Sequence, residues 1–241
     1  MSPVKKIEHQ FVGVLEEFLS CDALRKLTHG ELTVNHYKWI LRQIFHHARE
    51  NPQIQSLATT YFRGKHRGCV RQFYTHAVSE IGHDQLALND LAVLGEDTSN
   101  IPFENPLPDT SALLAFAFYQ IQFRNPIGYL GYLYFLEFTP TASGVAIISA
   151  LENLGVPKEA TSFLEDHTTI DVGHNKLMQG YLETLVTCEQ DLESVLYAMQ
   201  VTGRLYANML DGAVAQATRN QDFGVNFSEL NSSGRPAVLP A

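Results

Sequence analysis

The chain has 241 residues, of which 45% are hydrophobic and 18% charged, and its formal net charge is −9. This composition is typical of a globular protein with a substantial core, and the negative charge argues against nucleic-acid binding, which usually requires a basic face. The N-terminal residues lack the apolar core of a secretory signal, and polar residues interrupt the most apolar region, around residues 112–136, so we expect neither a signal sequence nor a membrane span. Three scattered cysteines, Cys21, Cys69 and Cys188, suit reduced thiols and a cytoplasmic location.

Helical periodicity dominates the chain, and the two-residue alternation of β-strands appears nowhere. Proline is expected to separate helices at Pro52 and Pro140, and residues 96–109, rich in Pro, Asn and Asp, are expected to form a surface loop. The sequence therefore predicts an all-α fold, a single compact bundle of about seven or eight helices in one domain, 1–225, followed by a flexible C-terminal tail, 226–241. The predicted helices cover residues 4–19, 34–50, 52–62, 69–94, 111–137 with a bend at Asn125-Pro126, 144–153, 157 to beyond 174, and 191–218.

A cluster of potential metal ligands lies on the helix predicted to begin at residue 157. His167, Asp171 and His174 have the spacing H-x3-D-x2-H, which at 100° per residue places them within about 60° of one another on one helix face. Two imidazoles and a carboxylate together suit a divalent transition metal. Because His167 and His174 start about 10 Å apart along the helix axis at 1.5 Å per residue, the spacing favours two metal ions over one.

A second cluster, His76, Glu80 and His83, repeats this spacing with Glu in place of Asp, on the helix predicted at residues 69–94. Glu137 stands between the clusters in the apolar run GYLGYLYFLEF. An ionised carboxylate buried there would cost several kcal/mol unless it were paired or bound to a metal. The alternatives are a buried hydrogen bond for Glu137 and exposed charge patterning for the clusters. We interpret the three features as one metal centre.

Six of these residues match, in type and order, the metal ligands of a known family, the haem-oxygenase-like diiron oxidases and oxygenases, which are related to the TenA and PqqC proteins: Glu80, His83, Glu137, His167, Asp171 and His174. The resemblance spans roughly residues 5–220 and implies a haem-oxygenase-like helical fold. It also implies that the six residues hold two iron ions, or a manganese–iron pair. Many members separate the first Glu and His by six residues, whereas here the interval is two, and His76 stands where those members carry their Glu. We expect His76 to lie beside the ligands, although it could be an additional one.

The activity implied by the resemblance is that of a non-haem diiron oxidase or oxygenase. Such an enzyme uses O2 as co-substrate to oxidise a small carboxylate-bearing or aliphatic molecule, by C–C cleavage, decarboxylation or oxygenation at N or C. Its substrate pocket is expected to be apolar and aromatic, with Phe73, Leu133 and Tyr134 in its wall. The resemblance further implies a homodimer whose partner is a small-molecule substrate, with no nucleic acid and no membrane.

Other functions on the same bundle stay open. A TenA-like hydrolase would need a cysteine nucleophile beside an acid, and Cys69 is the candidate, whereas a PqqC-like oxidase would work without a cofactor. Haem binding through His29 or His9 would leave the paired clusters unexplained. A non-catalytic metal or ligand carrier would bind metal and consume no oxygen when reduced iron is supplied.

Overall fold

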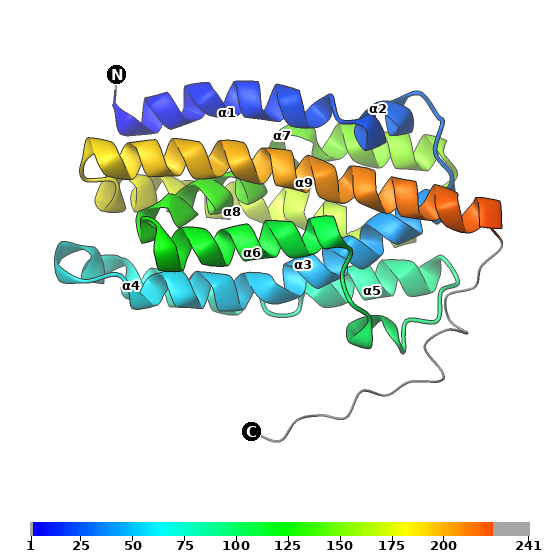
Figure 1. The fold of residues 1–241 in the computed structure, drawn as a ribbon, viewed down its shortest axis with the longest axis horizontal. Coiled ribbons are helices and arrows are strands. Elements are labelled where there is room, and N and C mark those ends of the chain that lie inside the picture. The colour runs from blue at the N-terminus through cyan, green and yellow to red at the C-terminus, as the bar shows by residue number, and fades with distance from the viewer. Residues whose placement is uncertain (1, 224–241) are drawn as a thin grey trace.

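The computed structural model describes the backbone of residues 2–223 and the side chains of residues 2–168 and 176–220. Within this part of the chain the structure is all α-helical and contains no strand, which confirms the predicted fold class. Most of the helices run along the long axis of the molecule (Figure 1). They are α1 (Pro3–Leu19), α2 (Asp22–Thr28), α3 (Val34–Thr60), α4 (Val70–Ser79), α5 (His83–Val93), α6 (Pro108–Phe123), α7 (Tyr129–Asn153), α8 (Ser162–Leu185) and α9 (Glu189–Phe223).

Helices α7 and α9 form the centre of the bundle. Helix α7 packs mainly against α8 and α9, and α9 also contacts α1, α3 and α6. In Figure 1, α9 extends along nearly the whole length of the molecule beside α1. The first seven residues of α7, 129–135, are all buried, as expected for a helix surrounded by others. The stretch Pro126–Asn153 is also long and apolar enough to cross a membrane by length and composition alone, a property that core helices share.

The close contact between α7 and α9 depends on a glycine. A Cβ atom added at Gly131 would lie 2.0 Å from the carbonyl oxygen of Val195 and 2.7 Å from the backbone nitrogen of Met199. Both atoms belong to the α9 backbone, which cannot move aside as a flexible side chain can. The absence of a side chain at Gly131 therefore sets how closely the two central helices approach.

Two helix ends predicted at proline are wrong. Helix α3 continues through Pro52, and α7 continues through Pro140, so residues 144–153 are the second half of α7 and not a separate helix. A proline inside a helix removes one backbone hydrogen bond and bends the chain, but it does not end a helix whose flanking turns are well packed. The predicted bend at Asn125-Pro126 is a true break, because α6 ends at Phe123 and α7 begins after a 3-10 turn.

The helix predicted at residues 69–94 is divided into α4 and α5. Gly82 lies between them with a φ of 102°, a left-handed conformation that glycine adopts at little cost and other residues avoid. His76, Glu80 and His83 therefore do not share the face of one continuous helix. The short helix α2 was not predicted, and α8 starts at Ser162, after a 3-10 turn, instead of at residue 157.

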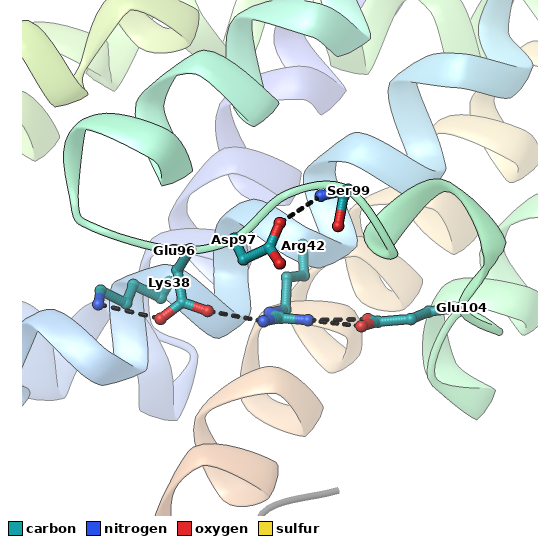
Figure 2. A network of polar contacts seen from close by, with 6 residues as sticks. All are labelled: Lys38, Arg42, Glu96, Asp97, Ser99 and Glu104. Carbon is teal, nitrogen blue, oxygen red and sulfur yellow. Dashed lines mark hydrogen bonds and ion pairs between the residues drawn. The ribbon is translucent and has the colours of Figure 1, made fainter. Parts of the chain in front are cut away.

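The surface loop predicted at residues 96–109 connects α5 to α6 and is tied to α3 by ion pairs (Figure 2). The guanidinium of Arg42 lies 2.7 Å from a carboxylate oxygen of Glu96 and 2.8 Å from one of Glu104, and the Lys38 amine lies 3.0 Å from Glu96. All four side chains are partly shielded from water, which strengthens such pairs relative to fully exposed ones. The loop thus holds the beginning of α6 against α3.

Replacing Gly131 by Ala is expected to lower the free energy of unfolding by about 1–3 kcal/mol or more, because the added methyl group collides with the α9 backbone. Chemical denaturation followed by circular dichroism measures this change. Gly13→Ala is the matched control, since Gly13 lies within α1 with nothing within 4 Å of an added Cβ. It should be neutral or stabilising by up to about 1 kcal/mol. Equal effects of the two substitutions would contradict the role of Gly131.

Candidate metal centre

Five of the predicted site residues meet inside the bundle. The last turn of α4 carries His76, and Glu80 follows it directly, while His83 is the first residue of α5. Glu137 comes from the middle of α7 and His167 from α8. His76 is 2% exposed, Glu80 9% and Glu137 5%, so two carboxyl groups lie in a largely apolar interior.

The carboxyl group of Glu80 joins the other side chains. Its Oε1 atom lies 3.5 Å from Nε2 of His76, and its Oε2 atom lies 3.3 Å from Nδ1 of His83. Nε2 of His76 is also 3.1 Å from Oε1 of Glu137. The rings of His83 and His167 are 4.9 Å apart in an edge-to-face arrangement. The site is thus a continuous chain of imidazoles and carboxylates with Glu80 near its middle.

These residues form two overlapping sets that could each hold a metal ion. Glu80, His83 and His167 make one set, and His76, Glu80 and Glu137 make the other, with the ligand atoms of each set within 4.8 Å of one another. With metal–nitrogen and metal–oxygen bonds of about 2.0–2.2 Å, neighbouring ligand atoms on one ion lie about 3.0–3.6 Å apart. Binding an ion would therefore shorten the widest separations within a set by as much as about 1–2 Å. Nitrogen and oxygen ligands of this kind suit iron or manganese.

His167 is oriented for metal binding by its own helix. Its Nδ1 lies 2.7 Å from the backbone carbonyl oxygen of Phe163, so Nδ1–H donates to that oxygen and Nε2 carries the lone pair. Burial lowers the pKa of His167, and the charge of His83 acts in the same direction, against the opposing effect of the hydrogen bond to Phe163. The neutral imidazole, which is the form that binds metals, is therefore favoured.

Glu80 is held in its ionised form. Burial acts to raise its pKa, but hydrogen bonds from His76 and His83, together with their charges, outweigh burial and keep the pKa below its usual value. Tyr129 behaves oppositely, because burial, with contributions from nearby charges including that of Glu137, raises its pKa well above the usual value. The centre thus combines an anionic carboxylate with a neutral phenol that can donate a hydrogen bond.

The ligands border a cavity that contains about 350 Å³ of space not filled by atoms. Its wall includes Asn51, whose Oδ1 accepts a hydrogen bond of 2.8 Å from the Tyr132 hydroxyl. That hydroxyl lies 2.7 Å from Nε2 of His47, a buried ring whose pKa is lowered to about 3, chiefly by burial. Asn51 is therefore fixed in the cavity wall by side chains behind it. The lining residues are Asn51, Gln55, Glu80, Tyr129, Leu133, Leu136, Glu137 and His167.

The remaining predicted residues are placed as follows. The backbone of α8 extends through Asp171 and His174, but the side chains of both lie outside the described residues. Leu133 lines the 350 Å³ cavity, as predicted for the substrate pocket. Phe73 packs against Phe62 and Tyr181, and Tyr134 against Phe11 and Phe138, so Phe73 and Tyr134 are core residues in the wall of neither described cavity.

Several residues beside the ligands were missed in the sequence. Asp166 lies 3.7 Å from Nε2 of His83, where a carboxylate helps to orient a metal-binding histidine. It directly precedes His167, and that adjacency is the signal that could have identified it. Asn51 lies beside the proline at which a helix end is predicted, and no spacing relates it to the ligands, because it comes from α3. Tyr129 lies on α7 eight residues before Glu137, with Leu133 midway between them, and this four-residue spacing on one helix face is the signal that could have identified it.

Comparison with known proteins identifies the fold and the family of the chain. Solved structures with this fold include a haem oxygenase-like domain of unknown function from Shewanella denitrificans, which is 23% identical with a TM-score of 0.84 and covers 94% of this chain and 97% of its own. A TenA homologue from Pseudomonas syringae pv. tomato is 11% identical with a TM-score of 0.73, and the match covers 89% of this chain and 93% of that one. A TenA homologue from P. horikoshii is 10% identical with a TM-score of 0.71, and the match covers 89% of this chain and 99% of that one. No curated protein matches the chain. Residues 38–207, which include four α-helices of the site, match the family described as iron-containing redox enzyme. The chain therefore belongs to the iron-containing redox enzyme family and has the haem-oxygenase-like fold that its sequence resembles.

Proposed function

We propose that this protein is a non-haem diiron oxidase or oxygenase that uses O2 to oxidise a small carboxylate-bearing or aliphatic substrate. The observation that carries the proposal is the position of the buried Glu80 in both sets of potential metal ligands. A carboxylate has two oxygens and can therefore serve two neighbouring ions. The family, whose members are iron-containing redox enzymes, supports iron as the metal.

The residues of the site have different roles in the proposed reaction. Glu80, His83, Glu137 and His167, with Asp171 and His174 from α8, would hold two ferrous ions, which supply electrons for the reduction of O2. His76 and Asp166 orient the neighbouring ligands through the contacts of 3.1 Å to Glu137 and 3.7 Å to His83. The Tyr129 hydroxyl stays protonated and can donate a hydrogen bond inside the cavity. Burial of the ligands limits the access of bulk water.

The alternatives find less support in the structure. A hydrolase nucleophile needs an accessible thiolate, whereas Cys69 is 4% exposed and burial raises its pKa. His9 and His29, the candidate haem ligands, are both exposed on the surface. A cofactor-free oxidase would not need a carboxylate shared between two imidazole-containing sets, and a passive metal carrier would bind iron without reacting with O2. Action on a small molecule in the cytoplasm, as a homodimer and without nucleic-acid or membrane partners, is part of the proposal.

The first test is reconstitution with ferrous iron in the absence of oxygen, followed by metal analysis and rapid mixing with O2. We expect about two iron ions per chain and an absorbance change that depends on O2. Glu80→Gln is expected to lose both ions, because Glu80 belongs to both sets. The control is Glu183→Gln, an exposed glutamate on α8, which should behave as the unaltered protein. If Glu80→Gln retained two ions and the reaction with O2, the proposal would be wrong.

The second test concerns His76. Because His76 belongs only to the set with Glu80 and Glu137, His76→Ala is expected to weaken binding of one ion by at least about 10–100-fold and to spare the other. Equilibrium titration with Mn(II), which needs no turnover, measures the two affinities. His46→Ala is the matched control, since His46 is 1% exposed and belongs to neither set. Unchanged affinities in His76→Ala would exclude the assigned role of His76.

A further inference from the structure

A second and larger cavity adjoins the metal centre. It contains about 880 Å³ of space not filled by atoms, with the open solvent at its mouth included. Leu136 and His167 line both this cavity and the 350 Å³ cavity of the metal centre. Leu136 immediately precedes Glu137, so one turn of α7 separates the two spaces. A molecule in the larger cavity would therefore have one end beside the ligands.

The larger cavity is elongated along α7. Its wall on this helix begins at Leu136 and recurs every three or four residues to Leu151, which corresponds to about 22 Å of helix at 1.5 Å per residue. Helix α2 contributes Leu24 and Leu27. The remaining wall comes from α1, α3, α8 and α9, and from Leu32 between α2 and α3. The α7 residues are Phe135, Leu136, Thr139, Pro140, Ser143, Gly144, Ile147 and Leu151, followed by Leu154 at the helix end.

The chemistry of the wall excludes a charged occupant along most of its length. Among the described lining residues there is no Lys, Arg, Asp or Glu. The Tyr37 hydroxyl donates to the carbonyl oxygen of Ala160, and the Ser143 hydroxyl donates to that of Thr139, so both are already satisfied. A charge placed here would be buried without a partner. The wall therefore suits hydrocarbon.

One hydroxyl near the metal end of the cavity lacks a partner. Thr139 is 8% exposed, and its Oγ1 has no hydrogen-bond partner among the described residues. Leaving a buried hydroxyl without a partner costs about 1–3 kcal/mol, which a hydrogen bond from a ligand would recover. Thr139 lies one helical turn after Leu136, on the same face of α7, and Leu136 and His167 line both cavities, so Thr139 is near the end at which the reactive part of a substrate would lie.

We propose that the larger cavity binds an unbranched aliphatic chain, with its polar end at Thr139 and His167 and its tail along α7 toward Leu151. The identification of this chain as the substrate rests on the proposed function, but the binding itself does not. The stripe of small and apolar residues on α7 is then the surface that limits the length of the bound chain.

The test uses metal-free full-length protein and a series of n-alkanols from butanol to dodecanol, with affinities measured by isothermal titration calorimetry. Each added methylene is expected to strengthen binding about fourfold, equivalent to about 0.8 kcal/mol, until the chain fills the cavity. Thr139→Val should weaken alkanol binding about two- to tenfold, the range of one neutral hydrogen bond, and leave the 1-bromoalkane of the same length unaffected. Affinities that do not depend on chain length would overturn the proposal.

Variants on α7 locate the bound chain. Ile147→Trp is expected to fill the middle of the cavity and to shorten the chain length at which affinity stops rising. Val145→Trp is the matched control, because Val145 lies on the same helix, is 75% exposed and does not line the cavity. Equal effects of the two variants would also overturn the proposal. If circular dichroism shows that Ile147→Trp is unfolded, Ile147→Phe replaces it with the same expected outcome.

The two proposals fail separately. Length-dependent binding in a protein that takes up no iron would refute the diiron function and keep the chain-binding cavity. Uptake of two iron ions and reaction with O2, without length-dependent binding, would refute only the cavity assignment.

Discussion

The burial of Glu80 and Glu137 inside the helical bundle is the constraint around which this part of the protein is organised. Removing an ionised carboxylate from water costs several kcal/mol unless charge or hydrogen bonds compensate. Here imidazoles from α4, α5 and α8 surround the two acids, at distances of 3.1–3.5 Å for His76 and His83. Keeping this group of strong metal ligands away from solvent therefore lowers the stability of the folded protein.

The surrounding structure fixes these side chains by local means. The left-handed Gly82 lies in the turn between α4 and α5, and across this turn a carboxylate oxygen of Glu80 and Nδ1 of His83 come within 3.3 Å of each other. The Phe163 carbonyl sets the ring of His167, and the hydrogen bonds behind Asn51 fix the opposite wall. The first two constraints are local, whereas the hydrogen bonds behind Asn51 join α3 to α7.

The sequence predicted the helical class better than it predicted the helix ends. Helical periodicity located α1, the start of α3 and α9, because a buried stripe repeats every three to four residues. The helix ends predicted at Pro52 and Pro140 are wrong, because tertiary packing overrides the local preference of proline to end a helix. Residues with the spacing H-x3-D-x2-H could be proposed as a set of ligands, whereas Asn51 joins the site only through the fold. The side chains of Asp171 and His174 lie outside the described residues, so their part in the predicted ligand set stays a prediction.

The single turn of α7 that carries Leu136 and Glu137 belongs to both cavities at once. A molecule in the larger cavity that binds preferentially to one conformation of this turn also changes the affinity of the metal centre for cations. Thermodynamic reciprocity then requires that cations change the affinity for the guest by the same factor. Binding in the larger cavity and binding at the metal centre are in this way coupled through one shared wall.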